Sequence, residues 1–177
     1  MESHSLTAAS AILLLMVLSA FFSATETAFT SINRIKIKNL ANDGNHKARR
    51  VVRLSEKYDD LLSTILIANN VVNIAATAIA TVLFIDLYGK YGPTIATIFS
   101  AVVILVFGEI TPKTVAKEIP EKFSMFAAPF ISAIMLIMIP ITFFFAVLKK
   151  ATVKLFKVSG HHKITEDELM TMVEEAE

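Results

Sequence analysis

The sequence predicts an all-α protein that crosses a membrane several times, and three observations lead to that fold class. Hydrophobic residues make up 54% of the 177 residues. They gather in long blocks, about 6–29, 61–87 and 93–109, whose lengths are close to that of an apolar helix spanning a bilayer. Basic residues concentrate outside these blocks, above all in 31–60. An ordinary soluble domain shows neither blocks of this length nor this separation of charge.

The first block predicts one membrane span over residues 6–29. It continues through the polar cluster Ser23–Thr27 and then Phe29, so the polar residues belong to the helix. A secretory signal peptide begins with a basic stretch, whereas the residues before this block contain Glu2 and no Lys or Arg. We therefore expect a retained span.

The basic segment 31–60 sets the expected orientation. It holds eight of the chain's 17 Lys and Arg residues, while the loop 86–93 holds one, Lys90. The positive-inside rule places 31–60 and the C-terminus in the cytoplasm, and the N-terminus and 86–93 outside. The turn-forming run 42–45 divides the segment into two short cytoplasmic helices, about 32–41 and 46–57.

Residues 120–157 are apolar enough for a further helix, but their flanks and prolines favour a kinked juxtamembrane helix. Lysines lie on both sides of the apolar part, and a fourth crossing would export the second group. Pro129 and Pro140 interrupt the helical hydrogen bonding. A plain fourth span is the alternative. We thus expect a transmembrane domain over 1–157.

Residues 158–177 predict a linker followed by the start of an acidic cytoplasmic helix. Thr165 and Glu168 have the spacing of a capping box at its beginning. We expect this helix to lead into a regulatory domain that is missing from this chain.

Polar residues inside the three spans predict a cation site. They fall into three groups, namely Ser23, Glu26 and Thr27; Asn69, Asn70 and Asn73; and Gly108 with Glu109. An ionised side chain within hydrocarbon is costly and indicates function. Pro112 has no N–H for the Gly108 carbonyl four residues earlier, which leaves that oxygen available. All these donors are oxygens, with no Cys in the chain and no His in the spans, so the site suits a hard cation such as Mg²⁺, Ca²⁺ or Na⁺.

Each polar group also has a purely structural interpretation. Ser and Thr in membrane helices commonly bond their own backbone, and Asn commonly joins packed helices. Glu26 could pair with Lys113, and Glu109 could lie in headgroup water at a helix end. Hydrolysis by Ser23 would need a base, and no His or Lys lies within the spans to provide one. We expect no enzyme activity, and the net charge of +1 gives no indication of nucleic-acid binding.

Three runs of the sequence resemble a known family. They are FFSATETA at 21–28, LLSTILIANNVVN at 61–73 and GEITPKT at 108–114. Together they look like the transmembrane domain of unknown function shared by CorB/CorC magnesium transporters and the cyclin M proteins. Ala24 and Ala68 stand where members of that family often have Gly.

The resemblance implies a multi-pass protein of the cell membrane that exports Mg²⁺ in exchange for Na⁺. It implies a homodimer of protomers with three spans and a juxtamembrane helix, followed by a pair of CBS modules that binds ATP and lies outside this chain. Carried over residue by residue, it implies an ion site drawing on Ser23, Thr27, Asn70, Asn73, Glu109 and the Gly108 backbone. A non-transporting membrane anchor or Mg²⁺ sensor that dimerises the CBS domains is the alternative.

Overall fold

The structure is a computed structural model that describes the backbone of residues 2–155 and the side chains of residues 5–141. The predicted linker and acidic helix over 158–177 lie outside the described residues. Within residues 2–155 the chain is helical and contains no strand, which confirms the all-α class. The elements are α1 (Glu2–Ser31), α2 (Arg34–Asn42), α3 (His46–Glu56), α4 (Tyr58–Tyr88), η1 (Gly89–Tyr91), α5 (Gly92–Val103), η2 (Ile104–Ile110), α6 (Thr111–Glu118) and α7 (Pro120–Leu155).

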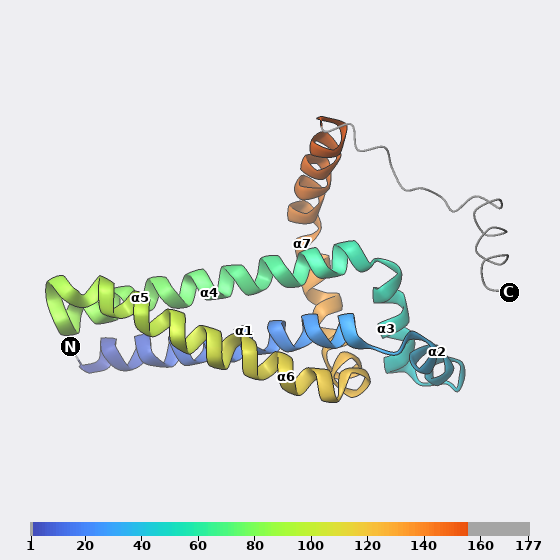
Figure 1. The fold of residues 1–177 in the computed structure, drawn as a ribbon, viewed down its shortest axis with the longest axis horizontal. Coiled ribbons are helices and arrows are strands. Elements are labelled where there is room, and N and C mark those ends of the chain that lie inside the picture. The colour runs from blue at the N-terminus through green and yellow to red at the C-terminus, as the bar shows by residue number, and fades with distance from the viewer. Residues whose placement is uncertain (1, 156–177) are drawn as a thin grey trace, which may run out of the picture. The chain divides into compact units, whose positions relative to one another are not determined.

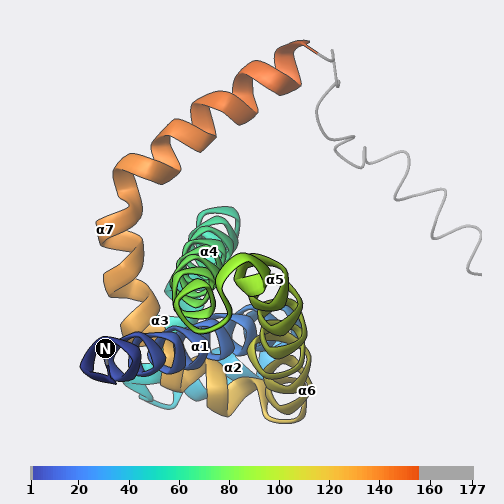
Figure 2. The same cartoon turned by 90° about the vertical axis from the view of Figure 1, so that its left-hand side faces the viewer.

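Three long helical rods lie side by side in the unit formed by residues 1–142. α1 packs against α4, and the continuous rod α5–η2–α6 packs against both (Figure 1). Viewed along the rods, the three are seen end-on as neighbours (Figure 2). Three described stretches are long and apolar enough to cross a membrane, namely Ser5–Ser31, Tyr58–Glu118 and Pro120–Ile141. The chain is a multi-pass membrane protein, and which ends face the cytoplasm stays a prediction.

The second of these stretches folds back on itself, because the chain reverses at η1. Gly92 opens α5 at the point where α5 approaches the end of α4. A Cβ on Gly92 would lie 2.5 Å from the backbone of Ile85, so glycine allows this close approach. Stretch Tyr58–Glu118 therefore supplies two antiparallel rods, as the separate blocks at 61–87 and 93–109 predict.

The two predicted short helices form as α2 and α3, one at each side of a tight turn. The side chain of Asn33 caps α2 by accepting a hydrogen bond from the Lys36 N–H. Asn45 caps α3 in the same way, accepting from the N–H groups of Lys47 and Ala48. The turn at Asp43–Gly44 between them confirms the interpretation of the run 42–45.

The first part of α7 lies across the three rods instead of along them (Figures 1 and 2). It continues as a helix through Pro129 and Pro140. Its crossing direction favours the juxtamembrane interpretation over a fourth span parallel to the others, although its length and composition would also suit a span.

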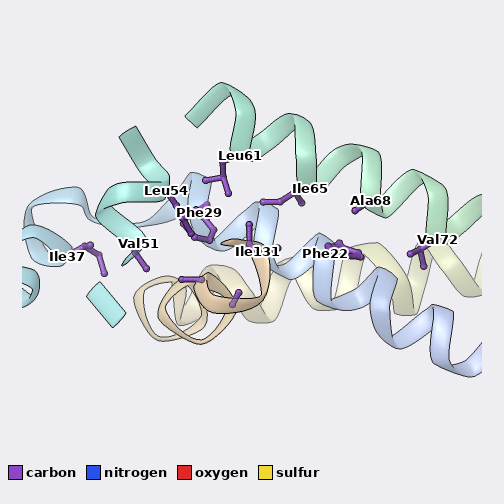
Figure 3. Packing of buried hydrophobic residues seen from close by; sticks show 12 residues of the cluster. Phe22, Phe29, Ile37, Val51, Leu54, Leu61, Ile65, Ala68, Val72 and Ile131 are labelled. Carbon is purple, nitrogen blue, oxygen red and sulfur yellow. The ribbon is translucent and has the colours of Figure 1, made fainter. Parts of the chain in front are cut away.

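The apolar core lies at the end of the bundle that carries α2 and α3. Figure 3 shows α1, α3, α4 and α7 converging there. The cluster contains Phe22, Phe29, Ile37, Val51, Leu54, Leu61, Ile65, Ala68, Val72, Ala127, Ala128 and Ile131. This packing fixes the rotation of α1 and α4, and so determines which of their polar residues face each other.

Candidate ion-binding site

Ser19, Ser23 and Asn69 form a polar cluster between α1 and α4. The hydroxyl of Ser19 donates to Oδ1 of Asn69 at 3.2 Å, and Nδ2 of Asn69 donates to Oγ of Ser23 at 3.3 Å. All three residues are buried, with 8% exposure for Asn69 and 1% or less for the two serines. One amide therefore bridges two hydroxyls that stand one turn apart on α1.

This bridging sets the two serines apart from the threonines of the spans. The threonine hydroxyls donate to the carbonyl four residues earlier in the same helix at Thr25, Thr64, Thr77, Thr81, Thr97 and Thr114. Such local bonds are the usual fate of these side chains in membrane helices. Ser19 and Ser23 instead direct their oxygens towards a second helix.

Gly108 brings the third rod to the same cluster. A Cβ on Gly108 would lie 2.9 Å from Oγ of Ser19, so only glycine leaves room for that hydroxyl. The Gly108 backbone is buried against α1 as a result. Residues of three separate rods thus meet near Ser19.

The rod changes its helical pattern where it meets the cluster. η2 is a π-helix over Ile104–Ile110, in which the N–H of Thr111 donates to the carbonyl of Val106, five residues earlier. Pro112 has no N–H, so it can bond neither Gly108 in the α pattern nor Phe107 in the π pattern. Short π segments within α-helices are frequent at functional sites. The helix continues through this loosened register rather than breaking.

Glu109 follows Gly108 and carries an uncompensated charge. Its side chain is half-buried, and within the described residues its carboxylate forms neither a hydrogen bond nor an ion pair. Lys113 lies one turn further along, where it could reach Glu109. Its Nζ is instead 3.1 Å from Oε2 of Glu26. The sequence left the pairing of Glu26 with Lys113 open as an alternative; the structure contains this pair, and it leaves Glu109 without a cation.

The remaining predicted donors are placed differently. Asn70 is exposed and takes no part in the hydrogen bonds of Ser19, Ser23 and Asn69, so the structure does not bring it into the cluster. Asn73 lies one turn from Asn69 on the same face of α4, and its buried Oδ1 has no hydrogen-bond partner in the described part of the chain. Thr27 is half-buried, one turn beyond Ser23.

Two residues of the cluster differ from the set implied by the resemblance. Ser19 is absent from that set, although its spacing of four from Ser23 and seven from Glu26 places all three on one helix face. This helical spacing was the sequence signal that could have identified Ser19 as a member of the cluster. Asn69 takes the inward position that the resemblance assigned to Asn70. The assignment of ligands to an ion stays a prediction.

The donors near this point are chemically consistent with a hard cation. They comprise hydroxyl, amide and backbone oxygens with one unpaired carboxylate nearby. Among the described residues no group of three or more His, Cys, Asp or Glu is placed to hold a metal. The geometry therefore resembles neither a thiolate–imidazole site nor a dense carboxylate cage, and it suits a cation that keeps some of its water.

Comparison with known proteins agrees with this architecture. A family model described as the cyclin M transmembrane N-terminal domain matches residues 10–177. The chain belongs to this family. The match confirms the resemblance that the three sequence runs carry.

Several curated relatives of this cyclin M domain come from bacteria, and one of them is named an inner membrane protein. A UPF0053 protein of Haemophilus influenzae is 39% identical over 93% of this chain and 40% of its own length. The UPF0053 inner membrane protein YfjD of Escherichia coli is 36% identical over 90% of this chain and 38% of its own length. A polyamine export protein of Escherichia coli is 27% identical over 92% of this chain and 40% of its own length. The chain spans about two fifths of the length of these relatives. It is a multi-pass protein of the cell membrane, in a family that includes a named exporter.

Proposed function

We propose that this cyclin M domain exports Mg²⁺ across the cell membrane, with Na⁺ as the exchanged ion. The observation that carries the proposal is the meeting of Ser19, Asn69 and Gly108 from three rods beside the unpaired carboxylate of Glu109. A half-buried carboxylate among apolar residues is unfavourable by itself. A divalent cation bound beside it would remove that cost.

The donor set fits Mg²⁺ for a further reason. Mg²⁺ gives up its water reluctantly and is commonly held by one or two carboxylates together with retained waters. Glu109 would supply charge, while Ser23, Asn73, Thr27 and the Gly108 carbonyl would replace some of the water. The orphaned Oδ1 of Asn73 supports this role, because a buried acceptor without a donor is costly until something binds it.

Movement of the ion requires two states in which the site opens to opposite sides. The π segment η2 offers a place for such a change, since its register can shift between π and α bonding around Gly108 and Pro112. In the orientation we propose, α2, α3 and the C-terminus lie in the cytoplasm and the N-terminus lies outside. The ion would then leave the cytoplasm past Glu26 and Lys113.

Export of an organic polycation is a second candidate. Two relatives are named polyamine export proteins, and this chain is 25% and 27% identical to them. A polyamine would also be attracted by the uncompensated Glu109 carboxylate. It would use the amide and hydroxyl oxygens as hydrogen-bond acceptors instead of metal ligands.

A third candidate is an anchor or sensor that binds Mg²⁺ without moving it. It would hold a homodimer together in the membrane and report ion binding to CBS modules that bind ATP in the longer protein. An enzymatic role has less support, because the Ser23 hydroxyl bonds the Asn69 amide, which cannot act as a base.

The deciding experiment measures flux from liposomes that contain the purified chain. Vesicles loaded with Mg²⁺ or with spermidine are diluted into Na⁺ or choline medium, and release is followed with time. Export of Mg²⁺ that depends on Na⁺ is expected, with Glu109→Gln lowering the rate by about tenfold or more. Glu118→Gln, which removes an exposed carboxylate at the end of α6, is the matched control.

Each alternative predicts a different result. Release of spermidine but not Mg²⁺ would favour the polyamine exporter. Mg²⁺ binding without release would favour the sensor. Equal Mg²⁺ export by Glu109→Gln and the unmodified chain would remove Glu109 from the mechanism.

A further inference from the structure

An open groove lies between α3 and α7, and none of its lining residues belongs to the cluster at Ser19. Its volume is about 570 Å³. One wall is the basic face of α3, and the other is the apolar face of α7 around Pro129. We call it the α3–α7 groove. Both walls belong to the unit formed by residues 1–142.

The α3 wall carries three cations in one stripe. Arg50 and Arg53 are three residues apart on α3 and so lie on one side of the helix, and Lys57 follows directly at its C-terminal end. All three are exposed, and none of them forms an ion pair with any residue that the structure describes. Glu56 also lines the groove, so the lining groups carry three positive charges and one negative charge.

Other basic side chains of this region already have partners. Lys36 pairs with Glu121 at 3.3 Å, and Nε of Arg49 donates to the carbonyl of Ala41 at 3.0 Å. The guanidinium of Arg34 lies 5.5 Å from the centre of the Tyr58 ring. Arg50, Arg53 and Lys57, by contrast, have no partner that the structure describes, and all three line the groove.

The α7 wall is apolar and offers no counter-charge. It consists of Pro129, Ala133 and Met135 together with Ser132, whose hydroxyl is occupied by the carbonyl of Ala128. Elsewhere on α7, large apolar side chains are more than half exposed, namely Phe126, Phe130, Leu136 and Ile137. In a membrane protein such a surface faces acyl chains. One wall thus suits an anion and the other suits hydrocarbon.

The position of the two walls is fixed by the core beneath them. Val51 and Leu54 of α3 are buried in the same cluster as Ile131 of α7, and Leu54 also lines the groove. Figure 3 shows these three side chains converging. The stripe of cations is consequently held beside α7, so the groove is preformed.

We propose that the α3–α7 groove binds one anionic phospholipid. Its phosphate lies against Arg50, Arg53 and Lys57, and an acyl chain lies along Pro129, Ala133 and Met135. A free phosphate would satisfy the cations alone, whereas a phospholipid uses both walls. The bound lipid would join α3 to α7 and so stabilise the end of the bundle that carries α2 and α3. This proposal is independent of the transported ion.

The test counts lipids bound to the purified chain by native mass spectrometry in neutral detergent. The probes are phosphatidylglycerol, phosphatidylcholine with the same acyl chains, and sn-glycerol 3-phosphate as a phosphate without a tail. Phosphatidylglycerol is expected to bind about tenfold more tightly than phosphatidylcholine, because only its headgroup carries net charge. Glycerol phosphate is expected not to displace it.

Two variants and one control locate the site. The triple variant R50Q/R53Q/K57Q should weaken phosphatidylglycerol binding by about tenfold or more. The control K38Q/K47Q/K90Q removes the same charge from exposed positions outside the groove and should change binding by less than about twofold. Ala133→Phe keeps every charge but fills the apolar wall, and it should also weaken binding.

Several outcomes would overturn the proposal. If the control triple variant weakened phosphatidylglycerol binding equally, the lipid would be held by diffuse electrostatic attraction and not by the groove. Displacement by glycerol phosphate would mean a free-phosphate site. Unchanged binding by Ala133→Phe would mean that no acyl chain lies on α7. Circular dichroism checks that each variant is folded. If the triple variant does not fold, the binding of phosphatidylglycerol by Ala133→Phe tests the proposal alone.

Discussion

Lys113 Nζ lies 3.1 Å from Oε2 of Glu26 on α1, although Glu109 is its neighbour one turn back along its own rod. A Glu and a Lys that follows it four residues later on the same helix normally attract each other. The pairing across rods therefore withholds the cation from Glu109. It leaves that carboxylate free of a protein counter-ion and accessible to a cation from solution.

A first prediction follows from this competition. Glu26→Gln releases Lys113. Because Lys113 follows Glu109 by four residues, it should then pair with Glu109 and lower cation export by about tenfold. The double variant Glu26→Gln/Lys113→Met should recover export, because no lysine remains to occupy the site. Flux from Mg²⁺-loaded liposomes checks both. Loss of export in the double variant, matching that of Glu26→Gln, would instead give Glu26 a direct role.

The same ion pair should contribute little to stability. The side chain of Lys113 is 40% exposed and that of Glu26 is 25% exposed. Solvent screening therefore limits the pair to about 1 kcal/mol or less. Its importance, on our interpretation, lies in where it holds the lysine.

A second prediction separates Asn69 from its neighbour Asn70. Asn69→Leu leaves the buried hydroxyls of Ser19 and Ser23 without their partner, which should lower the free energy of unfolding by about 1–3 kcal/mol. Asn70→Leu changes an exposed residue and should stay within about 0.5 kcal/mol. Thermal unfolding in one detergent compares the two variants. Loss of export by a stable Asn70→Leu variant would restore Asn70 to the ion site.

Much of the fold was predictable because its signals are local. Apolar blocks marked the helices, and the run 42–45 marked the turn between α2 and α3. The pairing of Glu26 with Lys113 was also within reach, since few charges occur in the spans. The helices and the turn depend on composition and spacing along a single segment, whereas the ion pair depends on the small number of charges available in the spans.

The identity of the inward asparagine was not predictable in the same way. Asn69 and Asn70 are separated by about 100° around α4, and either could face α1 by sequence alone. Long-range packing of Ile65, Ala68 and Val72 in the core decides the rotation. Likewise, Gly108 and Pro112 indicated only that the Gly108 carbonyl lacks its usual partner, whereas η2 adopts a π register where Gly108 lies against Ser19 of another rod.

A third prediction tests the contact between Gly108 and Ser19. The new methyl group of Gly108→Ala would lie 2.9 Å from the Ser19 hydroxyl and would force it away from Asn69. The lost hydrogen bond should cost about 1 kcal/mol of stability. In a Ser19→Ala background the same substitution should cost much less, because the crowded oxygen is gone. Additive costs in this double-mutant cycle would show that the two residues do not constrain each other.

The last prediction concerns the orphaned oxygen of Asn73. Removing a buried acceptor that has no partner loses no hydrogen bond, so Asn73→Ala should change the stability of the ion-free protein by about 1 kcal/mol or less. Ligand binding to the folded state raises stability, and the rise disappears when the ligand no longer binds. If Asn73 helps to hold Mg²⁺, the variant should lose the increase in unfolding temperature that Mg²⁺ gives the unmodified chain.

Asn70→Ala is the control for this measurement, since it removes an exposed amide from the adjacent position on α4. It should retain the Mg²⁺-dependent increase. Titrations with Mg²⁺ and, at equal ionic strength, with choline separate specific binding from a general salt effect. A full Mg²⁺-dependent increase in Asn73→Ala would show that the buried oxygen is not a ligand, because a site that had lost one of its few protein donors could not keep its affinity.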